Sequence, residues 1–164
     1  MGPKALKLWK SNVTSIKFFK SLNELHQAVQ EWHEKHGRPR SDEGMQGGAT
    51  IKQPGGKSEH WLNGGKGTAG NEDQAEAQST AKYYAHEFAH AVINATGFHA
   101  TDQWQRPAQQ DREFIYEKTA MGRSTDKPDE AFCDFAVAAW LAPGKAQEKA
   151  PHAWAQLRHW ELVP

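Results

Sequence analysis

The chain has a single cysteine among its 164 residues, so it can form no internal disulfide and its fold does not depend on oxidation. It also carries no formal net charge, because 20 lysines and arginines balance 20 aspartates and glutamates, and it lacks the basic excess typical of nucleic-acid-binding domains. No apolar run approaches the length of a membrane span, and the first residues lack the apolar stretch of a secretory signal. These absences predict a protein made in the cytoplasm, with no membrane span and no nucleic-acid partner.

Histidine and tryptophan are frequent instead, with nine and seven copies. Histidine is the commonest protein ligand of metal ions, so the histidines are the first place to search for a site. Hydrophobic residues make up only 37% of the chain, and its length is that of one domain. We therefore expect one domain with a modest core and long surface loops.

Strand signals are confined to the first part of the chain. Val13 to Phe19 is rich in β-branched and aromatic residues, which favour strands. Two shorter strands, Ala49 to Gln53 and Ser58 to Leu62, flank the turn sequence Pro54-Gly55-Gly56 and form a predicted hairpin. We expect a small, mostly antiparallel sheet within residues 13–70.

Helical signals dominate the remainder. A capping box, with Ser21 at the N-cap and Glu24 three residues later, opens a helix that stops at Gly37. Further helices are predicted over 72–95, 111–119, 129–141 and 151–160, with loops that include 38–48, 63–70 and 98–107. Strands followed by helices indicate the α+β class, with a sheet part at 13–70 and a helical part at 71–164.

His86, Glu87 and His90 form an H-E-x-x-H motif inside the longest predicted helix. Residues four apart lie on one helix face, one turn apart, so both imidazoles can reach one metal ion. Glu87 lies beside them and can point at a water on that metal, as a general base does. The motif predicts a zinc site of the kind found in metallopeptidases.

Zinc in a catalytic site needs a third protein ligand and an open fourth position. The metzincin pattern requires glycine and histidine three and six residues after His90, where this chain has Ile93 and Thr96. The remaining candidates are Glu130, Asp102 and His99. We favour Glu130, because a glutamate from a second helix is the gluzincin solution.

Asp134 follows Glu130 by four residues, so the two carboxylates share a face of the predicted helix 129–141. A carboxylate there can accept the free N–H of a zinc-bound histidine, which fixes the ring. Cys133 lies in the same apolar helix, and we interpret it as a buried core residue because no partner for reactivity is evident.

These motifs resemble those of a known family. The residues concerned are His86-Glu87-Phe88-Ala89-His90-Ala91-Val92, Gly97, Met121-Gly122-Arg123 and Glu130-Ala131-Phe132-Cys133-Asp134-Phe135. They are similar to the catalytic domain of anthrax lethal factor and related zincin-like bacterial toxin domains, over about residues 80–142. The resemblance implies a zincin-like fold with the active-site helix packed under the sheet. It further implies that Zn2+ is held by His86, His90 and Glu130, with Glu87 as general base and Asp134 behind a ligand.

One position departs from the family pattern. The family has a tyrosine before the Gly-Arg pair, thought to stabilise the oxyanion, whereas this chain has Met121. Another donor would have to replace it, and the candidates are Tyr116, Arg123 and His99. If none of them does, the activity differs from that of the family.

A second likeness involves the segment Glu130 to Pro143, which is similar to the end of ImmA/IrrE-type regulatory metallopeptidases. Both families are gluzincins, so the assignment of the site does not depend on the choice between them. The segment after His90 and the absence of a DNA-binding region favour the toxin-like interpretation.

The motif and the resemblance together predict a zinc-dependent endopeptidase that hydrolyses a protein substrate. By resemblance it would be an effector or toxin domain, delivered by a specialised secretion system and countered by a cognate immunity or inhibitor protein. Gluzincins commonly bind substrate as an added strand, and the hairpin 49–62 could supply the sheet edge. The alternatives are a regulatory ImmA/IrrE-type protease and a catalytically degenerate, zinc-stabilised protein-binding module.

Overall fold

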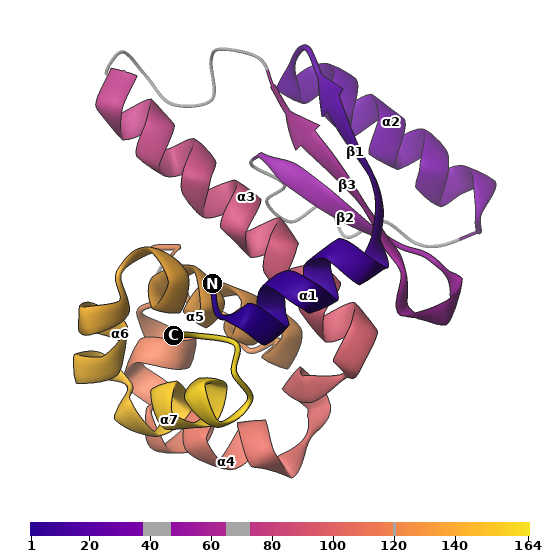
Figure 1. Cartoon of the computed structure of the whole chain (residues 1–164). Helices are drawn as coiled ribbons and strands as arrows, with labels where there is room; N and C mark the ends of the chain where they lie inside the picture. The colour runs from indigo at the N-terminus through magenta and orange to yellow at the C-terminus, as the bar shows by residue number, and fades with distance from the viewer. Residues whose placement is uncertain (38–46, 65–72, 120) are drawn as a thin grey trace.

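The computed structural model describes residues 1–37, 47–64, 73–119 and 121–164, with side chains except in 73–80 (Figure 1). The helices are α1 (Pro3–Asn12), α2 (Leu22–Lys35), α3 (Asp73–Thr96), α4 (Asp102–Gln110), α5 (Pro128–Leu141), α6 (Pro143–Lys149) and α7 (Pro151–His159). The strands are β1 (Val13–Phe19), β2 (Gly48–Lys52) and β3 (Ser58–Asn63), and short helical turns form η1 (Pro54–Gly56), η2 (Phe98–Ala100) and η3 (Glu113–Glu117). The described chain is thus a small sheet joined to a larger helical part, consistent with the α+β class.

The strand order in the sheet is β1-β3-β2. β2 and β3 are antiparallel and form the predicted hairpin, whose turn uses the positive φ angles of Gly55 and Gly56. β1 is parallel to β3, so the expectation of a mostly antiparallel sheet is wrong for one of its two pairings. The physical reason is α2, which lies in the connection between β1 and the hairpin and supplies the crossover that parallel strands need.

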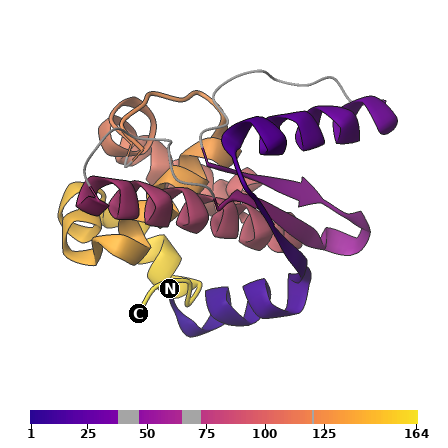
Figure 2. The same cartoon turned by 90° about the horizontal axis from the view of Figure 1, so that it is seen from above.

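One face of the sheet is covered by α2, as the view from above shows (Figure 2). The predicted capping box begins this helix, since Ser21 accepts the backbone N–H of Glu24 at 3.2 Å and the Glu24 carboxylate accepts that of Lys20 at 3.0 Å. The buried residues between helix and sheet are Leu25, Val29, Ile51 and Trp61. This small cluster packs β2 and β3 against α2.

The opposite face of the sheet packs against α3, and α1 packs against α3 in turn (Figure 2). α3 confirms the helix predicted over 72–95, although residue 72 lies outside the described residues. The helix ends at Gly97, which has a φ of 67° and donates its N–H to the carbonyl of Ile93 at 2.7 Å. The position of α3 against the sheet brings its central turn under β2.

α1 is a helix that the sequence did not predict. Its start is fastened to the end of the chain, because Gly2 N–H donates to Leu162 O at 2.8 Å and Lys4 N–H to Glu161 O at 3.2 Å. The two termini accordingly lie close together in both views (Figures 1 and 2). Ala5 is fully buried, so the helix is part of the main core and not a loose extension.

The helical part surrounds α5, whose residues 131–139 are all buried. The predicted helices 129–141 and 151–160 correspond to α5 and α7, and Cys133 is buried as expected. The loop expected at 98–107 is wrong, because η2 and α4 occupy it and Trp104 of α4 fills the core with no exposed surface. Residues predicted as a helix at 111–119 contain the π-helical turn η3, and α6 was not predicted.

The two remaining predicted loops, 38–48 and 63–70, fall mostly outside the described residues. Across the described ranges, no helix is both long enough and apolar enough to cross a membrane.

Candidate metal centre

α3 and α5 bring two histidines and one glutamate together. His86 and His90 lie one turn apart on α3, and their Nε2 atoms are 3.1 Å from each other. Glu130 lies in the first turn of α5, with Oε2 at 3.3 Å from His86 Nε2 and Oε1 at 3.5 Å from His90 Nε2. Their donor atoms all lie within 4.8 Å of one another, so the three residues could hold a metal ion.

The donor spacing is near that expected of a four-coordinate metal ion. With ligand bonds of about 2.0–2.1 Å, neighbouring donors of a tetrahedral ion lie about 3.3 Å apart. The two Nε2 atoms are 3.1 Å apart, and they lie 3.3 and 3.5 Å from two different oxygens of Glu130, so each separation is near that value. Three protein donors leave one position open on a four-coordinate ion.

The other candidates for the third ligand do not join this group. The Asp102 side chain is 87% exposed and lies 3.6 Å from Arg106 within α4. His99 belongs to η2 and is absent from the metal-competent group found among the described residues. Glu130 is the candidate that the structure places against both histidines.

Asp134 lies one turn beyond Glu130 and is fully buried. Its Oδ1 is 2.9 Å from His86 Nδ1, on the side of the ring away from the metal-facing Nε2. A carboxylate at this distance favours a proton on Nδ1, which leaves Nε2 for a metal. Asp134 thus lies within contact distance of a candidate ligand histidine.

Arg123 neutralises the two carboxylates of α5. Its Nε and Nη2 each lie 3.1 Å from the carboxylate oxygens of Asp134, and Nη2 is 2.6 Å from Glu130 Oε2. Such a fork fixes both carboxylates at once. These contacts commit Arg123 to the ligand residues, whereas the sequence suggested it as a donor to the reacting oxyanion.

Tyr116, another suggested oxyanion donor, is buried and its hydroxyl donates to Gln105 Oε1 at 3.4 Å. Burial raises the pKa of this phenol. His99 has a different environment, because burial lowers its pKa while Asp129 of α5 and Lys52 of β2 act on it in opposite directions. The turn η2, which carries His99, packs against α5.

The charged groups of the centre shift one another's pKa values. Burial lowers the pKa of His86, but its contacts with Asp134 and Glu130 outweigh burial and raise it to about 9. For Glu130, burial raises the pKa, and the two histidines with Arg123 outweigh that effect and hold it well below its usual range. A proton on His86 therefore occupies the metal-free centre at neutral pH, between two carboxylates.

Glu87 points toward the sheet. Its Oε2 accepts a hydrogen bond from the Thr50 hydroxyl at 2.7 Å, and its side chain is almost fully buried. Gly48 of β2 makes this approach possible, since a Cβ atom there would lie 2.7 Å from Glu87 Cγ. β2 and the general-base candidate are thus in direct contact.

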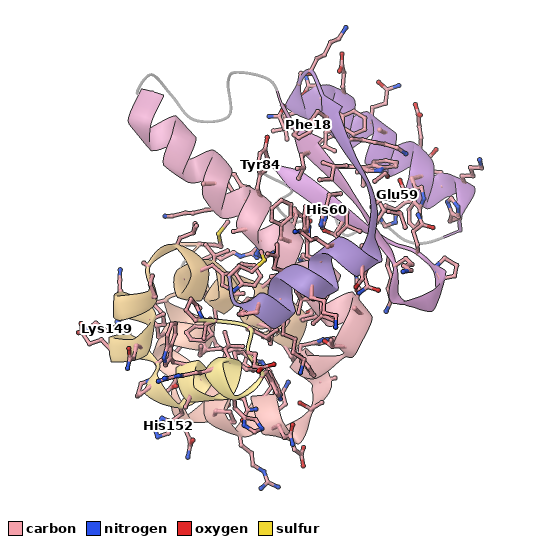
Figure 3. The ribbon with its side chains drawn as sticks, in the orientation of Figure 1. Phe18, Glu59, His60, Tyr84, Lys149 and His152 are labelled. Atoms are coloured by element: carbon pink, nitrogen blue, oxygen red, sulfur yellow. The ribbon has the colours of Figure 1, made fainter. Side chains whose placement is uncertain are left out.

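The sequence did not predict the residues that hold Glu87 on the side of the sheet, Thr50 and His60. His60 of β3 is completely buried where the sheet meets α3 and α1 (Figure 3). Burial, with a smaller effect of His90, lowers its pKa to about 4. The register of the hairpin could have revealed the contact of His60 with Thr50, because it places the two residues directly opposite each other.

Comparisons of the chain with protein-family models, with curated proteins and with solved structures found no match.

Proposed function

We propose that this chain is a zinc-dependent endopeptidase of the gluzincin type. The observation that carries the proposal is the convergence of His86, His90 and Glu130, with donor separations of 3.1 to 3.5 Å, beside Glu87 on the same helical turn. A zinc ion in this centre would supply Lewis-acid activation of a water molecule and of the scissile carbonyl.

Glu87 serves as the general base in this proposal. It takes a proton from the attacking water and passes it to the leaving amine. The Thr50 hydroxyl holds Oε2 at 2.7 Å, and the proposal assigns the other oxygen, Oε1, to that water. Of the three suggested oxyanion donors, His99 is the one that remains, since Tyr116 and Arg123 have other partners.

β2 supplies the docking edge for a peptide. It pairs with β3 on one side and, within the described ranges, with no strand on the other. Gly48 and Thr50 lie over Glu87, so an extended peptide added to this edge would pass beside the general base. Main-chain pairing of this kind gives affinity with little demand on sequence, so a protein substrate of broad sequence is expected.

The test begins with metal content by elemental mass spectrometry of wild type, Glu130→Ala and Asp129→Ala. Asp129 is the matched control, since it is the neighbouring acid in the same helical turn and lies outside the metal-competent group. One zinc per chain in wild type and in Asp129→Ala, with loss in Glu130→Ala, supports the centre. A wild type that takes up no zinc on reconstitution contradicts the proposal.

Activity is tested next, with a peptide library prepared from a digested proteome and read by mass spectrometry. Glu87→Gln should retain zinc and lose cleavage, because the amide cannot take a proton. Cleavage that persists in Glu87→Gln at the wild-type rate would remove Glu87 from the mechanism.

A second candidate is a catalytically degenerate, zinc-stabilised binding module. The observation that favours it is the engagement of Tyr116 with Gln105 and of Arg123 with the α5 carboxylates, with Met121 where the resembling family has tyrosine. It predicts zinc that raises the melting temperature and no cleavage of any peptide in the library.

The likeness to toxin domains extends the proposal to an effector role, with a cognate inhibitor protein as partner. The second likeness, to ImmA/IrrE-type proteins, would instead make the chain a regulatory protease. Expression of wild type and Glu87→Gln in bacterial and eukaryotic cells separates them. Growth arrest by wild type alone supports a toxin, and equal growth of both strains in every host contradicts it.

A further inference from the structure

Four residues from four elements form one chain of hydrogen bonds that ends at Glu87. The Trp9 indole N–H of α1 donates to His60 Nε2 at 3.1 Å. His60 Nδ1 lies 3.0 Å from the Thr50 hydroxyl, and that hydroxyl lies 2.7 Å from Glu87 Oε2. We propose that Trp9, His60 and Thr50 are a positioning relay that fixes the orientation of the Glu87 carboxylate; this rests on the function proposed above.

The donor and acceptor of each hydrogen bond in the chain follow from the indole N–H at its start. An indole N–H can only donate, so His60 Nε2 must accept and carries no proton. The ring is then neutral, with its proton on Nδ1, and Nδ1 donates to the Thr50 oxygen. The hydroxyl has one proton of its own, which is left for Glu87.

Two acceptors on Glu87 compete for that proton. The carboxylate Oε2 is 2.7 Å from the Thr50 oxygen and the backbone carbonyl is 3.0 Å from it. The carboxylate is charged and closer, so it takes the stronger bond. Bonds in such a chain polarise one another, which strengthens the last one.

Packing keeps the relay in this geometry. His60 is fully buried, and Phe88 of α3 lies against both donor rings, with its ring centroid 5.0 Å from that of Trp9 and 5.1 Å from that of His60. Phe88 follows Glu87 in sequence, so the same turn of α3 that bears the general base also holds the relay. The arrangement restricts the Glu87 carboxylate through its Oε2.

The first test is the tautomer of His60 in metal-free protein, read from long-range proton–nitrogen NMR correlations of the labelled imidazole at pH 7. The expected result is a neutral ring protonated on Nδ1. A proton on Nε2, or on both nitrogens, overturns the relay. The measurement needs neither zinc nor turnover, so it is independent of whether the chain is a peptidase.

The second test follows the carboxyl carbon shift of Glu87 at pH 7 in metal-free variants. Thr50→Val removes the hydroxyl and should move the shift, whereas Thr50→Ser keeps the hydroxyl and should restore it. Trp9→Phe keeps an aromatic ring but removes the fixed donor, so the Nε2–H tautomer of His60 becomes populated and the Glu87 shift moves. Trp140→Phe is the matched control, because it removes an indole bond to Leu162 O elsewhere and should change neither signal.

An unchanged Glu87 shift in Thr50→Val overturns the relay, and an unchanged His60 tautomer in Trp9→Phe overturns the role of Trp9 at its origin. If the library assay detects cleavage, Thr50→Val should lower kcat roughly tenfold with KM and zinc content unchanged, because only positioning is lost. If the wild type takes up no zinc, the proposed function is refuted. The NMR results then decide by themselves whether the relay exists.

Discussion

Asp134 Oδ1 and His86 Nδ1 lie 2.9 Å apart, and the aspartate has no exposed surface. The contact links the back of a candidate metal ligand to α5, the helix that also supplies Glu130. It makes the metal centre a joint property of two helices, since neither α3 nor α5 holds the full donor set.

The substitution Asp134→Asn should weaken zinc binding about 10- to 100-fold without abolishing it, because the partner of His86 becomes neutral while the three donors remain. Competition with a fluorescent chelator measures the affinity. Asp111→Asn is the control: Asp111 is also buried and accepts the Ala153 N–H at 2.8 Å, so its loss should lower stability without changing zinc affinity. Equal zinc affinities in wild type and Asp134→Asn would contradict the assigned role.

The raised pKa of His86 predicts how metal-free stability depends on pH. Its pKa rises from 6.5 in the unfolded chain to about 9 in the fold, so the folded state binds the proton more tightly. The stabilisation is fully present below pH 6.5 and is lost as pH rises through 9, by roughly 3 kcal/mol in all. Urea unfolding at pH 7 and pH 10 measures it. His86→Gln should not show this loss, and parallel behaviour of the two proteins would disprove the prediction.

Zinc binding should show the opposite dependence on pH. The proton on His86 Nε2 has to leave before that atom can bind a cation, so binding at pH 7 releases about one proton. The apparent Kd is therefore expected to fall about tenfold per pH unit between pH 7 and 9. Calorimetry in buffers of different ionisation enthalpy counts the protons, and a count of zero would show that His86 is already neutral.

Gly48→Ala should impair Glu87 while leaving the ligands in place. The added Cβ would lie 2.7 Å from Glu87 Cγ, so the general base or β2 has to shift. We expect zinc content to be retained and cleavage to fall roughly tenfold or more, because misplacement of a catalytic group by a fraction of an ångström is costly. Gly144→Ala is the matched control, since nothing lies within 4 Å of its added Cβ. Full cleavage by Gly48→Ala would mean that Glu87 tolerates the displacement.

The parts of the centre that could be predicted from sequence are those set by local geometry. The helical spacing of His86 and His90 is fixed by 3.6 residues per turn, and Glu130 and Asp134 share a face for the same reason. The convergence of α3 and α5 depends on tertiary packing, so Glu130, Asp102 and His99 could only be weighed against each other until the structure placed Glu130 beside both histidines.

The support around Glu87 could not be predicted, because it depends on long-range pairings. Thr50 reaches Glu87 only if β2 lies over α3, and Trp9 reaches His60 only if α1 docks beside β3. α1 itself was missed because its helical pattern is short and rich in lysine, and its docking uses residues at the far end of the chain. α4 was missed because its interior Pro107 resembles a loop signal, although it stands in a helix whose Trp104 is fully buried.

The bonds from Gly2 and Lys4 to the segment Glu161–Leu162 have a consequence for the order of assembly. A ribosome adds residues from the N-terminus, so α1 is made before the segment whose carbonyls fasten its start. Contacts between residues so distant in sequence also form late in folding, because closing the long loop costs entropy before the contact rewards it. The backbone bonds that fasten the start of the helix bearing Trp9 are therefore complete only after synthesis of this segment is finished.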